Sequence, residues 1–248
     1  MRADSSSGPR IRNSVGQVWL SRLTLPAYTV SEVARLVQVH RDTVTRWYSP
    51  RGGSGDSPRR RVLESRQPRR PLSYLDLIEA AMVAALRRAK VSLRNIRAAH
   101  AYLKRRLKVD HPFARTVLLS DGHRVLRELE ARGSAEWVKD FLEETSASGQ
   151  ITWSPPFAHL LRRFWFDEGL GIAVRWYPFG PECPVMVDPR IAFGTPVLTD
   201  SRVPTWIIRD RRKAGESART IAADFEIDEG SVRAALAFEE RLESRRAA

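Results

Sequence analysis

Two short amphipathic segments, separated by a break of three residues, constrain the fold of this chain more than any other sequence feature. The segments are residues 32–37 and 41–48, and Ser31 is the expected N-cap of the first. Helices this short are stable only when their apolar faces pack against each other and against a larger core. The spacing therefore predicts a helix-turn-helix. Its apolar positions are Val30, Val33, Ala34, Leu36, Val39, Val44 and Trp47.

The polar residues of the second segment indicate what such a unit could contact. If Val44 and Trp47 face the core, the other side chains point outward, where Arg and Thr can bind phosphates and base edges of DNA. An ordinary helical hairpin is the structural alternative, because short capped helices are common. The predicted DNA-binding residues of this segment are Arg41, Thr43, Thr45, Arg46 and Tyr48.

Positive charge is concentrated in the first third of the chain. The 248 residues include 42 Lys and Arg against 29 Asp and Glu, which gives a formal net charge of +13. Residues 1–71 contain 14 Arg and 5 acids, whereas residues 150–248 contain 14 basic and 14 acidic residues. Electrostatic contact with nucleic acid is therefore expected at the N-terminal end. The loop arginines predicted to add phosphate contacts are Arg59, Arg60, Arg61, Arg69 and Arg70.

The order of the expected elements favours an α+β fold that is mainly α. It combines a helix-turn-helix with a helical hairpin, a small mixed α/β middle, and a C-terminal three-helix part with a helix-turn-helix outline. The Ser, Gly and Pro content of residues 49–71 indicates a basic loop within the first unit. The predicted units are a flexible basic arm at 1–26, a DNA-binding domain at 27–109, a mixed region at 110–184 and a C-terminal helical domain at 185–248.

Caps and periodicity locate the individual elements. Ser73 with Asp76 is a variant of the capping box, and Ser92, Ser217 and Asp228 are expected N-caps of later helices. The expected helices run from Ser73 to Leu86, from Ser92 to Leu107, over Ala135–Glu144, Phe157–Phe166, Thr205–Lys213 and Ala218–Asp224, and from Asp228 to about Leu242. The expected extended segments are Arg115–Leu119, Arg124–Leu129, Ile151–Trp153, Gly171–Tyr177, Val185–Asp188 and Pro196–Leu198, and Val15–Leu25 is a further short ordered segment.

The first unit resembles the N-terminal half of a MerR-type DNA-binding domain. The likeness covers Tyr28–Tyr48, and Leu72–Ile78 is similar to the helix that follows the wing in that family. The chain departs from the family at residues 49–71, which are longer and looser than a usual wing. The resemblance implies operator binding as a dimer, with a flexible basic loop in place of a compact wing.

A second resemblance covers about residues 185–242. Val187–Pro204 carries the ordered pattern Asp-Pro, Gly-x-Pro and Arg-hydrophobic-Pro, which is similar to a bacterial family catalogued as domain of unknown function 433. Combined with the MerR-like segment, this pattern resembles a VapB-type antitoxin. The resemblance implies a PIN-like ribonuclease toxin as partner and a homodimer or larger hetero-oligomer. It also implies that an antitoxin arginine pairs with the toxin's metal-binding carboxylates.

Aromatic residues and arginines in the second half supply candidates for toxin contact. Residues 153–179 are rich in large aromatics, most of which core packing would explain, and any excess would form an exposed interface patch. Arg202 could instead bond within its own domain. Several glutamates on the last expected helix would repel phosphate, so this end is expected to bind protein or to dimerise. The candidates for toxin contact are Arg163, Trp165, Arg175, Trp176 and Arg202.

The sequence has no pattern typical of a metal site, a cofactor site or a catalytic pair. Its five histidines form no H-x-x-x-H pair, and it has no Gly-rich phosphate loop and no Gly-x-Ser-x-Gly elbow. His100 is expected to be a satisfied, partly buried residue. No cofactor, no metal and no enzymatic activity are therefore expected. A single cysteine, Cys183, and the lack of an apolar leader or membrane-length run favour a cytoplasmic location.

Two other functions stay open at this point. A ligand-responsive MerR-like regulator without a toxin partner would be favoured by a deep pocket lined by the aromatic residues of 153–179. An enzyme, for example a nuclease with a basic groove, would be recognised by metal-dependent turnover of the purified protein.

Overall fold

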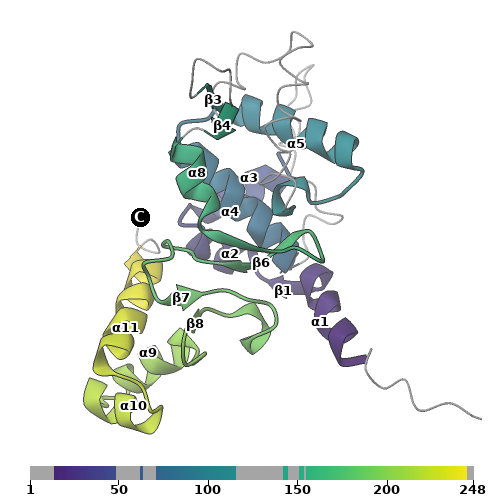
Figure 1. Cartoon of the computed structure of the whole chain (residues 1–248). Helices are drawn as coiled ribbons and strands as arrows, with labels where there is room; N and C mark the ends of the chain where they lie inside the picture. Colours follow the sequence, from purple (N-terminus) through teal and green to yellow (C-terminus); the bar gives the residue numbers. More distant parts are fainter. Residues whose placement is uncertain are drawn as a thin grey trace, which may run out of the picture.

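The computed structural model describes residues 14–48, 62–63, 71–115, 142–144, 151–153 and 155–244. Within these residues the chain is mainly helical and has four antiparallel sheets of two strands each (Figure 1). The predicted fold class, α+β and mainly α, is confirmed. None of the helices in the described ranges is long and apolar enough to cross a membrane.

A capping box starts the first of the two short helices. The N-terminal elements are α1 (Ser14–Thr24), β1 (Pro26–Tyr28), α2 (Val30–Leu36) and α3 (Arg41–Tyr48). Thr29 caps α2, so the predicted Ser31 cap is wrong. The Thr29 N–H donates to the Glu32 carboxylate at 2.7 Å, and the Glu32 N–H donates to the Thr29 hydroxyl at 3.2 Å. Ser31 could not form such a pair, because the residue three positions later is Ala34, whose side chain has no hydrogen-bond acceptor.

A tight turn joins α2 to α3. Gln38 adopts a left-handed backbone conformation with φ of 58°, and the Val39 N–H donates to the Ala34 carbonyl at 2.9 Å. Val39 packs against the core from this turn. The turn allows α2 and α3 to pack against each other, and the bounds of α3 are those expected from the sequence.

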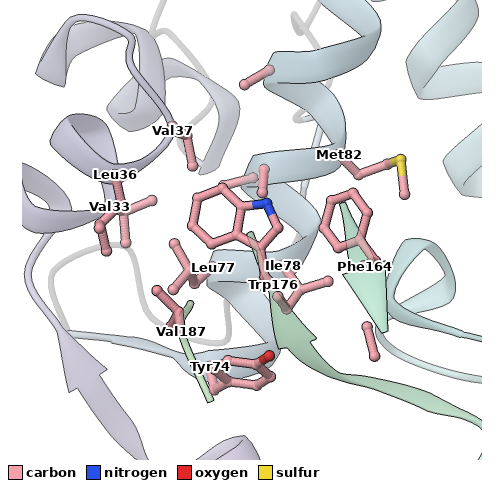
Figure 2. Close-up of a cluster of buried hydrophobic side chains, with 14 of the residues drawn as sticks. Val33, Leu36, Val37, Tyr74, Leu77, Ile78, Met82, Phe164, Trp176 and Val187 are labelled. Atoms are coloured by element: carbon pink, nitrogen blue, oxygen red, sulfur yellow. The ribbon is translucent and has the colours of Figure 1, made fainter. Parts of the chain in front are cut away.

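Helix α4 (Tyr74–Arg88) forms the centre of the hydrophobic core. Ser73 caps it in a capping box with Asp76, as predicted, and β2 (Leu72–Ser73) pairs with β1 just before it. Figure 2 shows side chains of α2, of β5 (Phe164–Asp167) and of β6 (Ile172–Trp176) meeting those of α4. A helix that is apolar around most of its circumference is stable only when covered on several sides. Residues of all four predicted units belong to one core, including Leu23 of α1 from the predicted arm.

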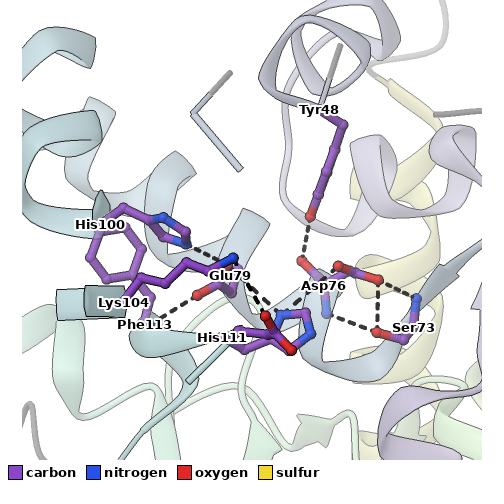
Figure 3. A network of polar contacts seen from close by, with 9 residues as sticks. Tyr48, Ser73, Asp76, Glu79, His100, Lys104, His111 and Phe113 are labelled. Atoms are coloured by element: carbon purple, nitrogen blue, oxygen red, sulfur yellow. Dashed lines mark hydrogen bonds and ion pairs between the residues drawn. The ribbon is translucent and has the colours of Figure 1, made fainter. Parts of the chain in front are cut away.

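A buried polar network attaches α4 to α5 (Leu93–Leu107), which Ser92 caps as predicted, and to the 3-10 helix η1 (Pro112–Ala114). The Glu79 carboxylate lies 2.9 Å from His100 Nε2 and accepts the Phe113 N–H at 2.9 Å (Figure 3). Burial raises the pKa of Glu79, but the hydrogen bond with His100 and the charges of His100 and His111 outweigh it and lower that pKa to about 2. His100 is satisfied, as predicted, but it is buried, at 3% exposed, where partial burial was expected.

Strands replace part of the helices expected in the middle region. The elements are β3 (Leu142–Glu144), β4 (Ile151–Trp153), α8 (Pro155–Leu161), β5 and β6. The helices predicted over Ala135–Glu144 and Phe157–Phe166 are wrong at their C-terminal ends. Residues 142–144 pair with β4, and 164–166 pair with β6, which leaves the rings of β5 alternately buried and exposed. The extended segments expected at 115–119 and 124–129 lie outside the described residues, except for Arg115.

Short extended pieces followed by three helices form the C-terminal part, as predicted. The elements are β7 (Val185–Met186), η3 (Ala192–Gly194), β8 (Val197–Leu198), α9 (Thr205–Lys213), α10 (Ala218–Asp224) and α11 (Glu229–Glu243). Ser217 and Asp228 cap α10 and α11. Trp176 and Val187 exchange two backbone hydrogen bonds of 2.9 and 2.8 Å, which connect this part to β6.

Candidate functional site

Helix α3 presents a polar face to solvent. Arg41, Thr45 and Arg46 are exposed, and Thr43 is half-buried. Arg46 Nε donates to the Asp42 carbonyl at 3.0 Å, and a terminal nitrogen of Arg46 donates to the Thr43 hydroxyl at 3.1 Å. These contacts hold the guanidinium group along its own helix. Four of the five residues predicted for DNA contact in this segment therefore lie together on an accessible surface.

Tyr48 is not part of that surface, so its predicted role in DNA contact is wrong. Its side chain is 4% exposed, and its hydroxyl donates to the Asp76 carbonyl at 2.8 Å (Figure 3). Burial raises the pKa of this tyrosine well above its ordinary value. Tyr48 follows Val44 by four residues, and this spacing places both on the core side of the helix.

The basic loop after α3 is described at two residues. Val62 and Leu63 are buried, and both of their N–H groups donate to the Trp47 carbonyl at 3.0 Å. These bonds hold part of the loop against the C-terminal end of α3. The predicted phosphate contacts lie outside the described residues, and they are Arg59, Arg60, Arg61, Arg69 and Arg70.

A second surface combines arginines with aromatic rings, and we name it the arginine–aromatic surface. Arg175 lies 5.4 Å and Arg190 lies 5.7 Å from the centre of the Trp165 ring. Arg190 also lies 5.6 Å from the Trp19 ring, so one guanidinium group contacts both indoles. A guanidinium group within about 6 Å of an aromatic ring is attracted to the electrons of that ring. The members of this surface are Trp19, Arg22, Trp165, Arg175, Arg190 and Phe193.

A buried carboxylate contacts the two central arginines. Asp188 is fully buried, and its two carboxylate oxygens accept from Arg190 at 2.9 and 2.6 Å. Arg175 Nε lies 3.5 Å from the same carboxylate. The hydrogen bonds to Asp188 raise the pKa of Arg190. A two-point contact between a guanidinium group and a carboxylate fixes orientation as well as distance, so Asp188 sets where Arg190 points. Arg175 Nε makes no hydrogen bond in the described structure.

Phe193 extends the arginine–aromatic surface outward. Its side chain is 73% exposed, and Arg22 lies 4.5 Å from its ring centre. The φ angles of Ala192, Phe193 and Gly194 are 43°, 55° and 79°, so three successive residues are left-handed. Left-handed backbone is costly for residues other than glycine, and such conformations concentrate at functional sites.

The structure brings together only part of the predicted toxin-contact set. Trp165 is exposed and Arg175 half-buried, and both belong to the arginine–aromatic surface. Trp176 is 3% exposed and packs in the core, so its predicted contact role is wrong. Arg163 donates to the Pro178 carbonyl at 3.3 Å, beside Arg241 of α11. Arg202 is exposed in the connection between β8 and α9, with φ of 60°.

Sequence reasoning missed four members of the surface, which are Trp19, Arg22, Arg190 and Phe193. Arg190 and Phe193 lie within Val187–Pro204, the segment that carries the Asp-Pro, Gly-x-Pro and Arg-hydrophobic-Pro pattern. Phe193 directly precedes the turn residue Gly194, and an aromatic residue in that position is a signal of exposure that could have been used. No local signal marks the other two, because only the fold brings α1 beside the η3 loop.

One polar hollow of about 360 Å³ is present in the C-terminal part. It is lined by Pro184, Leu198, Thr199, Asp200, Ser201, Glu226, Ile227, Asp228 and Ser231. None of the aromatic residues of 153–179 lines it, so it is not the pocket that the ligand-responsive alternative needs. The described residues also contain no group of three or more His, Cys, Asp or Glu placed to hold a metal ion.

Known proteins share both halves of this architecture. Residues 185–238 match the family described as "Protein of unknown function (DUF433)". The chain is 26% identical over 227 residues to "Putative antitoxin VapB45" of Mycobacterium tuberculosis, and the match covers 87% of this chain and 94% of that protein. The crystal structure of Rv2018 from Mycobacterium tuberculosis is similar with a TM-score of 0.69 and 25% identity, covering 87% of this chain and 99% of the other. The chain is thus similar over most of its length to a protein named as an antitoxin, and over residues 185–238 to a family of unknown function.

Proposed function

We propose that this chain is a cytoplasmic antitoxin of a type II toxin–antitoxin system. It binds a cognate PIN-like ribonuclease toxin directly and represses its own operon by binding DNA. The observation that carries the proposal is the extent of the likeness to a protein named as an antitoxin, which spans both the N-terminal helices and the C-terminal family segment. A match confined to residues 185–238 would support only a shared module.

The α3 surface supports the DNA-binding part of the proposal. Two exposed arginines and an exposed threonine lie on a helix whose opposite face is anchored in the core. The basic residues at 49–71 follow this helix directly in the sequence. A single helix of this size makes few contacts, so a homodimer that reads two half-sites is the arrangement we propose.

Neutralisation is proposed to occur through an arginine that pairs with the carboxylates of the toxin. Arg202 and Arg175 are the better placed of the three predicted arginines, because Arg202 is exposed and Arg175 borders an accessible surface. Arg163 is half-buried and already donates to a backbone carbonyl. A guanidinium group offers a two-point contact to a carboxylate, which suits competition with a metal ion for the same oxygens.

Co-expression of the full chain with the product of the adjacent gene tests the proposal. We expect the two proteins to co-purify and to elute together on size exclusion at a fixed ratio. If this chain elutes alone, as a dimer that still binds its own promoter, the antitoxin proposal fails and a ligand-responsive regulator takes its place.

A further inference from the structure

We propose that the arginine–aromatic surface is a docking site for an acidic segment of a partner protein that also carries apolar side chains. The inference rests on the proposed function, since the partner meant is the toxin, and it names the surface and the chemistry of the contact. Trp165 and Phe193 would be the apolar anchors, and Arg22, Arg175 and Arg190 would bind carboxylates.

The first reason is the exposure of two large rings in a rigid setting. Trp165 is 46% exposed and Phe193 is 73% exposed, whereas the other aromatic rings of the β5–β6 pair are buried. Phe193 is held outward by left-handed backbone, and the following residue is fixed because its carbonyl accepts from Tyr28 Oη at 2.8 Å. An outward phenylalanine on strained backbone buries little apolar surface in the monomer, but it is suited to insertion into a partner.

The second reason is that the surface exists only in the folded chain. Its six residues come from α1, from β5 and β6, and from the segment between β7 and β8. Cation–π contacts connect these three parts of the chain to one another. Arg22 also donates to the Pro189 carbonyl at 3.4 Å across 167 residues. Large aromatic residues and arginines are the residue types that contribute most at protein interfaces, particularly when they are held in place beforehand.

Charge favours an acidic protein segment over nucleic acid as the occupant. The three guanidinium groups face two carboxylates, Asp188 and Asp167, so the excess of positive charge is small. Four of the six members come from residues 150–248, where basic and acidic residues balance, whereas binding of nucleic acid requires a larger net positive field.

The test measures binding of the adjacent gene product to variants of the full chain. The double variant Trp165→Ala with Phe193→Ala removes both anchors, and Trp206→Ala is the matched control, because Trp206 is 45% exposed on α9. We expect at least about a 30-fold weaker Kd for the double variant and less than about a threefold change for the control. All variants are first compared by thermal unfolding, and exposed rings should be removable with little change in Tm.

A charge-reversal pair tests the acidic character of the partner. Arg22→Glu should weaken binding and make it less sensitive to salt, whereas Arg219→Glu, on exposed α10 surface, should change neither. Equal effects of the two reversals would overturn the assignment of an acidic segment to this surface.

The outcomes separate this inference from the proposed function. If the toxin binds the double variant as tightly as the unaltered chain, the surface assignment is overturned and the antitoxin proposal stands. If the double variant keeps toxin binding but loses DNA or RNA binding, or loses self-association, the surface belongs to that other contact and the inference is equally overturned. If the unaltered chain binds no adjacent gene product, both proposals fall together.

Discussion

Tyr28 and Gly194 are 166 residues apart in the sequence and are joined by a buried hydrogen bond of 2.8 Å from the tyrosine hydroxyl to the glycine carbonyl. Tyr28 ends β1, directly before the cap of α2, and Gly194 ends the loop that carries Phe193. A Cβ atom on Gly194 would lie 2.1 Å from this hydroxyl. This contact is one of those that fit the two halves of the chain to each other, and it lies between the proposed DNA-binding helices and the arginine–aromatic surface.

Removing the Tyr28 hydroxyl should destabilise the whole fold. Tyr28→Phe leaves a buried carbonyl without its donor, so we expect the free energy of unfolding to fall by about 1–3 kcal/mol. Tyr74→Phe is the matched control, because that hydroxyl is buried without a hydrogen-bond partner in the described structure and its loss should cost little. Chemical denaturation measures both variants. A similar loss for the two would contradict the role given to the Tyr28 bond.

Gly194→Ala should be more harmful than alanine at another left-handed glycine. The new methyl group meets the Tyr28 hydroxyl and the backbone is left-handed, so we expect a loss of about 3 kcal/mol or more. Gly215→Ala is the control, because Gly215 has φ of 95° with open space around it and should cost only about 1–2 kcal/mol. Tyr28→Phe combined with Gly194→Ala should cost less than the sum of the two single changes. Strict additivity would show that the two residues do not interact.

The histidine network should make stability depend on pH. Burial lowers the pKa of His111, but the carboxylate of Glu79, 3.9 Å from His111 Nδ1, outweighs this and raises the pKa above its ordinary value of 6.5. A raised pKa in the folded state adds stability that is fully present below pH 6.5 and is lost as pH rises through the folded value. The charges that face His111 also include Asp76 and Asp110.

Thermal unfolding between pH 5.5 and 8.5 checks this expectation. The Tm of the unaltered chain should fall toward the alkaline end, and His111→Gln should flatten that slope. The carboxylate of Glu79 acts in the opposite sense, because its stabilisation is present above about pH 4.5 and is lost as pH falls toward 2. Equal slopes for the unaltered chain and His111→Gln would rule out the titration of His111 as the cause.

The arginines of α3 should contribute to DNA affinity through phosphate contacts. The double variant Arg41→Ala with Arg46→Ala should bind the promoter fragment more weakly, with a salt dependence shallower by about 0.9 per lost contact in log–log terms. Arg219→Ala, on α10, is the control and should leave the salt dependence unchanged. Affinity measured over a salt series gives both values. If the α3 variant keeps the salt dependence of the unaltered chain, these two arginines do not contact the DNA phosphates.

Local signals predicted much of the fold, whereas the arginine–aromatic surface depended on contacts far apart in sequence. The caps at Ser73, Ser92, Ser217 and Asp228 and the bounds of α3 follow from residues within four positions of each other. The run Phe164–Phe166 reads equally well as helix or strand, and pairing with β6 decides it. Arg22 and Phe193 meet only because α1 lies beside the η3 loop, which no local pattern reports.

Inhibition of the adjacent gene product tests the central claim most directly. The purified product should cleave RNA by itself, and its activity should fall to background as the full chain is added up to a fixed molar ratio. Removal of this chain by proteolysis should restore that activity. If the purified product has no ribonuclease activity, or if that activity persists in the presence of excess chain, the chain is not the antitoxin of that protein.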